Sequence, residues 1–204
     1  PWGGLDMLLS TNPIAAAIPT LNEPPVVLDM ATTVAAYGKV KAKAQRGEMM
    51  PEGWMIDRQG KPLLDPNKSH EGFLLPIGGY KGYGLSLIVG ILAGTLNGAA
   101  MGSQVIDFNQ DFTSTTNTGQ AIAVIDPSAF GDIDEFKQNV DRLVRELRGA
   151  ERMPGVDRIW LLGEQSHHKR TEHETQGVLL APSLVKQLSE MAVQLKITPL
   201  QAIQ

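Results

Sequence analysis

The sequence has no cysteine and few aromatic residues, which make up 5% of its 204 positions. The absence of cysteine excludes disulfide bonds, thiolate catalysis and cysteine-ligated zinc or iron–sulfur centres. It also fits a reducing compartment, so we expect a cytoplasmic protein.

Long apolar runs and a strong excess of one charge are also missing. Glycines, Ser86 and Asn97 interrupt the longest apolar stretch, so we expect no membrane span of about 18 residues and a soluble protein. The net charge of −4 offers no basic face, and we expect no binding to nucleic acid. The hydrophobic content of 42% is enough to bury a core, in one large domain or in one domain and part of another.

The sequence opens at Pro1, Trp2 and Gly3, without an initiator methionine or a signal peptide. We therefore expect this end to be a cut within a longer chain.

The segment 74–96, LLPIGGYKGYGLSLIVGILAGTL, combines a glycine cluster with an apolar helical pattern. Its glycines, followed by a helix start near Lys81, favour a cradle for a phosphate or carboxylate, because such a turn offers free N–H groups, a dipole and a positive charge. The other interpretation is a glycine turn that merely begins a buried core helix, with Lys81 solvated. The order G-x-x-G-x-G is not the Rossmann fingerprint, and Gly82 after Lys81 excludes a P-loop.

Upstream, the pattern predicts strands at 14–18 and 26–28 and a helix over 34–46 that Gly47 ends. Asp29 at a strand end, followed by threonine hydroxyls, suits hydrogen bonds to a ribose or amide. Equally, Thr32 or Thr33 could serve only as the N-cap of the helix.

Downstream, we expect a turn at 57–60 between two short strands, strands at 121–125 and 159–162, and an amphipathic helix that follows Asp132 with Glu135 as a capping box. A closing helix is expected to pack on another domain, through Leu184, Leu188, Met191 and Leu195.

The polar stretch that ends at Gln176 contains several possible metal ligands, namely His167, His168, Glu172, His173 and Glu174. On a helix only His168 and Glu172 share a face, and no third ligand aligns with them. We expect an exposed polar helix and no metal site.

Several segments, in this order, resemble the malate/L-lactate dehydrogenase family of NAD(P)-dependent oxidoreductases, which includes ureidoglycolate, sulfolactate and diketogulonate enzymes. They are STNPIAAAIPT, VVLDMATTVAAYGKV, PEGWMIDRQGKPLLDP, LLPIGGYKGYGLSLIV, AIAVIDPSAF and LGEQ. The resemblance covers nearly the whole chain, as the C-terminal portion of the family's sequence.

The resemblance implies a mixed α/β, non-Rossmann NAD(P)-binding domain with a largely antiparallel sheet flanked by helices. Residues 1–150 would form most of this domain, and 151–204 would be a C-terminal helical segment that returns to a second domain. It further implies a homodimer, NAD or NADP as cofactor, and hydride transfer between nicotinamide and a small 2-hydroxy acid or 2-oxo acid.

Carried over residue by residue, the resemblance places cofactor contacts at Asp29, Met30, Ala31, Lys81, Gly163 and Glu164. Leu162 stands where relatives usually have proline, which leaves the backbone of that late loop less defined. The family's acid/base histidine and substrate-gripping arginine lie upstream of Pro1, so we expect no catalytic residue in this chain. Two alternatives stay open, a nucleotide-binding module without catalysis and a structural partner domain.

Overall fold

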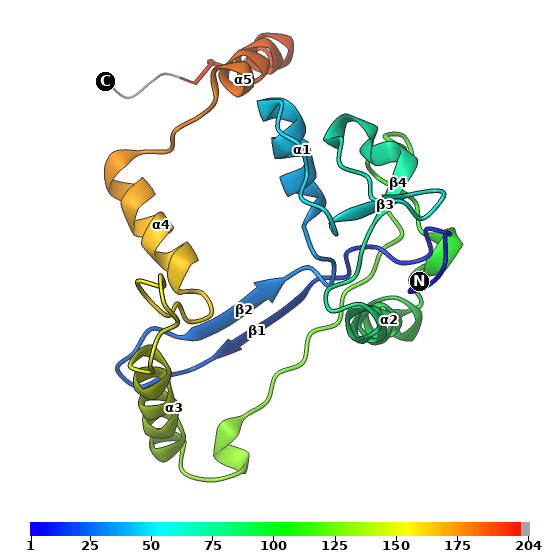
Figure 1. Ribbon diagram of the computed structural model, residues 1–204. Coiled ribbons are helices and arrows are strands. Elements are labelled where there is room, and N and C mark those ends of the chain that lie inside the picture. The colour runs from blue at the N-terminus through cyan, green and yellow to red at the C-terminus, as the bar shows by residue number, and fades with distance from the viewer. Residues whose placement is uncertain (201–204) are drawn as a thin grey trace. The chain divides into compact units, whose positions relative to one another are not determined.

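The computed structural model describes residues 1–200 of a mixed α/β chain (Figure 1). Its strands are β1 Ile14–Ile18, β2 Val26–Met30, β3 Met55–Asp57 and β4 Gly72–Leu74. Its α-helices are α1 Tyr37–Arg46, α2 Tyr80–Ala93, α3 Ile133–Arg148, α4 Glu164–Gln176 and α5 Pro182–Leu195. Short 3₁₀ helices are η1 Pro66–Glu71, η2 Thr95–Asn97, η3 Gly102–Gln104 and η4 Pro127–Ala129.

The chain forms two compact units. The first comprises Pro1–Ile18 and Val27–Lys137, and the second comprises Pro19–Val26 and the chain from Gln138 onward. Each contains its own set of internal contacts, and each is described by itself.

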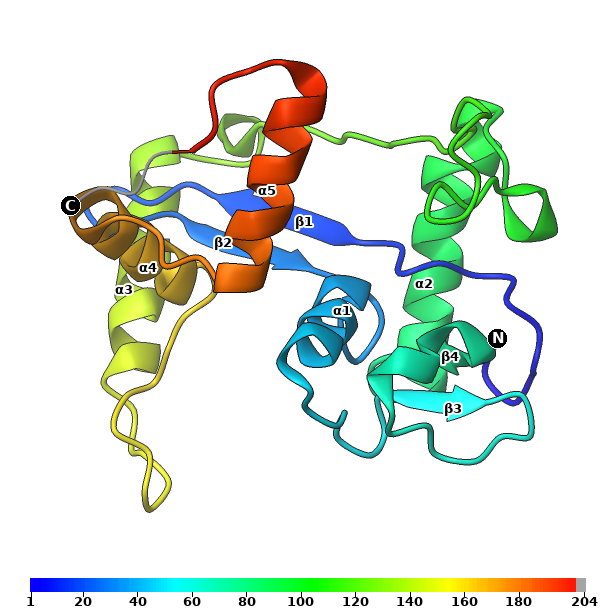
Figure 2. The ribbon, with the colours of Figure 1, turned by 90° about the horizontal axis from the view of Figure 1, so that it is seen from above.

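The apolar core of the first unit lies where α1 meets the short sheet of β3 and β4. Its buried members are Val40, Met50, Met55 and Leu63, against which Tyr37, Trp54 and Leu74 pack. The two strands are antiparallel, with Met55 opposite Leu74, and Figure 2 shows them beside α1. A Cβ at Gly72 would lie 2.2 Å from the carbonyl oxygen of Ile56, so this pairing requires a glycine there.

The strand at 14–18 is confirmed, and it pairs with β2 in a separate two-stranded sheet. β2 continues two residues beyond the predicted end, so Asp29 and Met30 belong to the strand. The predicted turn at 57–60 is also confirmed, because the N–H of Gly60 donates to the carbonyl oxygen of Asp57. The chain after it makes only an isolated bridge between Ile56 and Pro62, not the second strand we expected.

Helix α1 begins at Tyr37, three residues later than predicted, and neither Thr32 nor Thr33 caps it. The reason is that 32–34 is held in extended backbone pairing, with an isolated bridge between Thr33 and Pro76. The helix ends as predicted at Gly47, whose φ of 65° is left-handed.

Helix α2 differs from the expected buried helix. It begins at Tyr80, so Lys81, Gly82 and Gly84 lie within it, and its buried residues are Gly82 and Ser86. Ile88 and Leu92 are exposed. The expectation of a buried helix was wrong, because within α2 a glycine and a serine are buried and its large apolar side chains are not.

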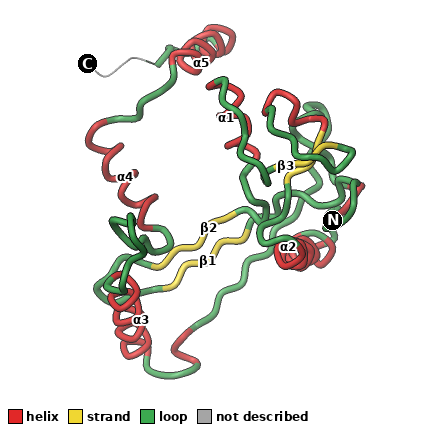
Figure 3. The backbone as a smooth tube through the Cα atoms, viewed as in Figure 1, coloured by secondary structure: helices red, strands yellow, loops and turns green. Residues whose placement is uncertain are grey.

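The predicted strands at 121–125 and 159–162 do not form. Figure 3 shows the chain between α2 and α3 as loop, apart from short helical turns. The residues Ile122 and Val124 are 87% and 90% exposed. A segment with a β pattern becomes a strand only where a neighbouring strand completes its hydrogen bonds. Within the described residues, no strand pairs with either segment.

The helical predictions of the second half hold. The carboxylate of Asp132 accepts the backbone N–H of Glu135 at 2.8 Å, as a capping box predicts, and α3 follows. Helix α4 carries no buried residue, which confirms the exposed polar helix. Helix α5 covers the predicted apolar positions, and its packing on another domain stays a prediction. Among residues 1–200, no helix is both long and apolar enough to cross a membrane.

Candidate cofactor site

Backbone hydrogen bonds bind three sequence motifs of the first unit into one framework. The N–H and the hydroxyl of Thr32 both donate to the carbonyl oxygen of Thr11, each at 2.9 Å. The N–H of Ile77 donates to the carbonyl oxygen of Thr32 at 3.0 Å, and that of Val34 to Leu75 at 2.9 Å. Thr32 is fully buried. The segment that follows Asp29, Met30 and Ala31 is therefore hydrogen-bonded to Thr11 on one side and to the residues just before α2 on the other.

Asn12 adds a side-chain bond to this framework. Its Nδ2 donates to the carbonyl oxygen of Ser86 at 2.9 Å, and its φ of 26° is positive. A Cβ at Gly90 would lie 2.8 Å from that Nδ2, so Asn12 packs directly on α2. Sequence reasoning did not place Asn12 at this site. The signal that could have done so is Gly90, whose missing side chain leaves room for Asn12 on α2.

The glycines at the start of α2 have different physical roles. Gly78 and Gly79 have φ values of 56° and 64°, in the left-handed region that disfavours other residues. A Cβ at Gly82 would lie 1.9 Å from the carbonyl oxygen of Ile77. At Gly84 there is open space. The cluster therefore turns the chain sharply and lets α2 start against the segment before it.

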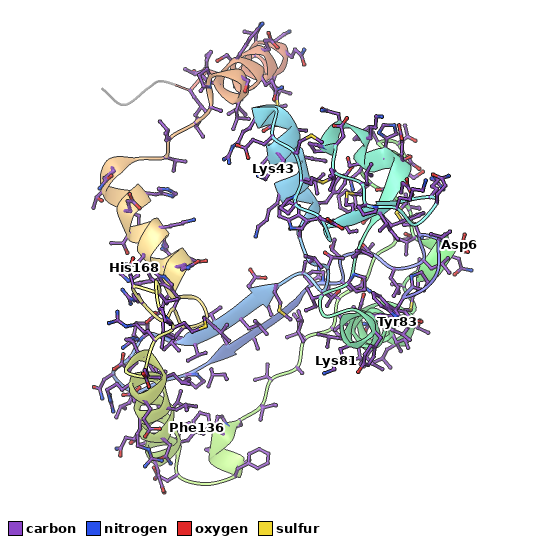
Figure 4. All side chains as sticks on the ribbon, viewed as in Figure 1. Asp6, Lys43, Lys81, Tyr83, Phe136 and His168 are labelled. Atoms are coloured by element: carbon purple, nitrogen blue, oxygen red, sulfur yellow. The ribbon has the colours of Figure 1, made fainter. Side chains whose placement is uncertain are left out.

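Lys81 projects from the first turn of this helix (Figure 4). No acidic side chain occupies that turn, and the N-cap Gly79 has no side chain to satisfy the first N–H groups. Those N–H groups have no partner within the helix, and the helix dipole adds a partial positive charge. The geometry fits a phosphate or carboxylate, as the cradle interpretation requires.

Asp29 lies exposed on β2, while Met30 and Ala31 are half-buried. Ala31 immediately precedes Thr32, whose carbonyl oxygen accepts from Ile77, four positions before Lys81. Four of the six predicted cofactor residues, Asp29, Met30, Ala31 and Lys81, thus lie within four positions of a residue in this hydrogen-bonded framework of the first unit. Their contact with a cofactor stays a prediction.

Gly163 and Glu164, the other two, belong to the second unit and begin α4. Gly163 has a left-handed φ of 88°, and the side chain of Glu164 is only 10% exposed. Its Oε1 accepts from Nε and Nη2 of Arg148 at 3.0 and 2.6 Å. Its Oε2 accepts from the backbone N–H of Leu161 at 3.1 Å and from Arg158 at 3.3 Å.

The ionisation of Glu164 reflects these contacts. Burial opposes the charged form, but the Leu161 N–H and the Arg148 guanidinium outweigh it, so the pKa of Glu164 lies below its usual value. Hydrogen bonds to both glutamates, Glu164 and Glu23, raise the pKa of Arg148. Glu164 and Arg148 are therefore both charged at neutral pH.

The same arginine reaches the turn that joins β1 and β2. Its Nη1 donates to Oε2 of Glu23 at 2.9 Å. The carboxylate of Asp141, almost fully buried, accepts the backbone N–H groups of Leu21, Asn22 and Glu23 at 3.1, 2.9 and 3.4 Å. Burial of Asp141 opposes its charge, yet these N–H groups lower its pKa. Sequence reasoning missed this cluster, although Asp141 stands three positions before the apolar Val144 and so on the inner face of α3.

Two further features of the chain are not cofactor or metal sites of the kind the sequence suggested. A cavity of about 630 Å³ lies beyond the C-terminal end of α2, lined by residues that include Asn97, Gln104 and Asn117, and it contains none of the predicted cofactor residues. Within the described range, no three histidine, aspartate or glutamate side chains gather closely enough to hold a metal ion. His168, labelled on α4 in Figure 4, instead makes a T-shaped contact with Trp160, with ring centroids 5.4 Å apart.

The sequence profile described as malate/L-lactate dehydrogenase matches residues 1–189. The malate/(S)-sulfolactate dehydrogenase of Methanothermus fervidus is 40% identical over 200 residues, which are 97% of this chain and 56% of the relative. A ureidoglycolate dehydrogenase (NAD(+)) of Escherichia coli O157:H7 is 34% identical over 188 residues, 92% of this chain and 53% of that protein.

Solved structures agree with these matches. The malate dehydrogenase of Pyrococcus horikoshii OT3 superposes with a TM-score of 0.82 at 28% identity, covering 98% of this chain and 55% of that one. The sulfolactate dehydrogenase of Methanocaldococcus jannaschii gives 0.78 at 32% identity, covering 97% and 56%. The chain spans about half the length of the curated relatives it matches. It belongs to the malate/L-lactate dehydrogenase family.

Proposed function

We propose that the protein is an oxidoreductase that transfers a hydride between a nicotinamide dinucleotide, NAD or NADP, and a small 2-hydroxy acid or 2-oxo acid. The family membership and the names of the relatives support this proposal, since those relatives are malate, sulfolactate and ureidoglycolate dehydrogenases. In this proposal the chain supplies the cofactor-binding portion, residues 1–150 form most of a non-Rossmann binding domain, and 151–204 return to a second domain.

The observation that carries the proposal is the start of α2. This start is glycine-rich, has no side-chain cap and carries Lys81 on its first turn. Just before it, the N–H of Ile77 donates to the carbonyl oxygen of Thr32, in the segment that follows Asp29. Such a start fits the pyrophosphate of a dinucleotide. When bound, the cofactor would accept or give the hydride, and Lys81 would bind and orient its negatively charged part.

The chemistry also needs an acid or base with a pKa near the working pH and a cation that grips the substrate carboxylate. We propose that these two groups come from outside the 204 residues. We further propose a cytoplasmic homodimer, as the resemblance implies.

Turnover tests this proposal. The full-length protein is assayed against a panel of 2-hydroxy and 2-oxo acids with both nicotinamide cofactors, beside the 204-residue chain alone. We expect turnover of a small 2-hydroxy acid by the former and none by the latter, because loss of a positioned acid/base typically removes a factor of about 10²–10⁴. Robust turnover by the 204 residues alone would place the catalytic groups among them and refute the assignment.

The same samples separate the alternatives. Binding of reduced cofactor without turnover by the full-length protein supports a nucleotide-binding module, and absence of binding supports a structural domain. Asp29→Asn adds a residue-level test, since a ligand role lowers cofactor affinity with little change in melting temperature, whereas a role in the fold reverses that pattern.

A further inference from the structure

The segment 121–125 has the composition of a strand but makes none of a strand's hydrogen bonds. Its sequence, AIAVI, places Ile122 and Val124 on one face of an extended chain and Ile125 on the other, and β-branched residues favour strands. All three residues are exposed. Within residues 1–200, no backbone hydrogen bond runs to or from this segment. Figure 1 shows it drawn out between α2 and α3, with its apolar side chains and its backbone groups uncovered.

The sheet of β1 and β2 is also incomplete. It has two strands, so each strand has one unpaired edge (Figure 3). No residue of either strand is buried. A two-stranded sheet by itself is at best marginally stable in water, and stability requires a third strand or packing against a helix. Open edges of this kind bind further strands through main-chain hydrogen bonds.

The length of the relatives indicates what covers these surfaces. The aligned part is 56% of the Methanothermus fervidus dehydrogenase, so much of that protein has no counterpart in these residues. The Pyrococcus horikoshii structure superposes on 98% of this chain, which covers 55% of it. The backbone path of this chain is thus largely kept within a longer protein, whose other residues are available to cover it. A second copy would supply a neighbour only in the dimer, whereas β1 and β2 need one in every folded chain.

We propose that residues 121–125 form a strand in the full-length protein, paired with a strand of the same chain that lies outside these 204 residues, in one sheet with β1 and β2. The partner strand carries β-branched or aromatic residues at alternate positions, because its side chains lie beside Ile122 and Val124 on the apolar face. β1, most of β2 and the segment 121–125 all belong to the first unit, so the inference concerns that unit alone. It does not depend on the proposed function.

Hydrogen exchange of the full-length protein tests the pairing without any substitution. We expect the amides of 122–125 to exchange at least about 100-fold more slowly than those of Thr115 and Thr116, in the exposed loop before them, because amides bonded within a sheet exchange only when the sheet opens. Exchange as fast as in that loop would leave the segment a free surface and overturn the proposal.

Photo-cross-linking identifies the chain that supplies the partner strand. Ile122→p-benzoylphenylalanine places a photoreactive group on the apolar face of the segment, and mass spectrometry locates the residue to which it attaches. We expect a product of single-chain mass, attached to a residue outside these 204. A product of doubled mass would make a second copy the occupant. Attachment within the 204 residues would make the segment pair inside this chain, and no product at all would leave its apolar face uncovered. Each of these three results overturns the proposal.

A charged substitution measures the energetic consequence. Ile122→Lys should lower the melting temperature of the full-length protein by about 4 °C or more, because it places a charge on a face that the partner strand buries. Thr115→Lys, in the exposed loop, is the matched control and should leave the melting temperature unchanged. Equal melting temperatures in the two variants would show that Ile122 stays exposed in the full-length protein, against the proposal.

Discussion

The two units of this chain differ in the interactions that stabilise the interior of each. The first has an apolar core of Val40, Met50, Met55 and Leu63, with no charged side chain among its members. The second is organised around the buried carboxylate of Asp141 and the pairs made by Arg148. Apolar burial is nondirectional and independent of pH, whereas buried charge requires its partners in place and ionised.

The difference indicates where each unit is sensitive. The stability of the first unit should depend mainly on the volume of its buried apolar side chains. The stability of the second should depend on the protonation of its buried carboxylates and on the geometry of their hydrogen bonds.

The largest effect is expected from Met55→Ala. Met55 is 2% exposed in the core, and truncation of a buried methionine costs about 2–5 kcal/mol through lost burial and the cavity left behind. Urea unfolding measures the change. Met49→Ala, on an exposed neighbour, is the control and should change the free energy of unfolding by less than about 0.5 kcal/mol. Equal effects would show that the core is not where we place it.

Two alanine substitutions in α2 should have opposite signs. Gly82→Ala places a Cβ 1.9 Å from the Ile77 carbonyl oxygen, and overpacking of this kind costs about 1–3 kcal/mol. Gly84→Ala meets no atom within 4 Å and should stabilise the helix by about 0.5–1 kcal/mol. Thermal melting of both variants measures the signs. The same sign in both would contradict the described contact between α2 and Ile77.

The second unit should be sensitive to acid through its two buried carboxylates. The folded pKa values of Asp141 and Glu164 lie below their ordinary values of about 4. Their contribution is therefore present above about pH 4 and is lost as the pH falls through the folded values. Asp141→Asn should lower stability at neutral pH and flatten its decline toward acid. Glu151→Gln, at an exposed position, should leave the pH profile unchanged, and a profile unaffected by Asp141→Asn would contradict the role of this carboxylate.

Local sequence signals predicted the parts of the fold that depend on local chemistry. The strand at 14–18, the glycine that ends α1 and the capping box at Asp132 all follow from side chains within a few residues of the feature. The start of α1 was missed because Thr32 and Thr33 are bonded to distant segments, which no local pattern reveals.

The same limit applies to the candidate sites. Lys81 and the glycines were found from sequence because they lie together along the chain. The Arg148 cluster was not, because its partners Glu23 and Glu164 are 125 and 16 residues away. The strand pattern at 121–125 failed for a related reason, since pairing depends on a second strand and not on the pattern alone.

The central claim is that the start of α2 binds a nicotinamide dinucleotide through Lys81. Its most direct test is the titration of NADH and NADPH into unmodified protein, Lys81→Ala and the control Lys39→Ala, an exposed lysine on α1. The account predicts that Lys81→Ala weakens binding by about 1.5–3 kcal/mol, with the melting temperature unchanged, because a hydrogen-bonded charge pair is lost. Lys39→Ala should bind as the unmodified protein does. An unchanged dissociation constant in Lys81→Ala would contradict the claim.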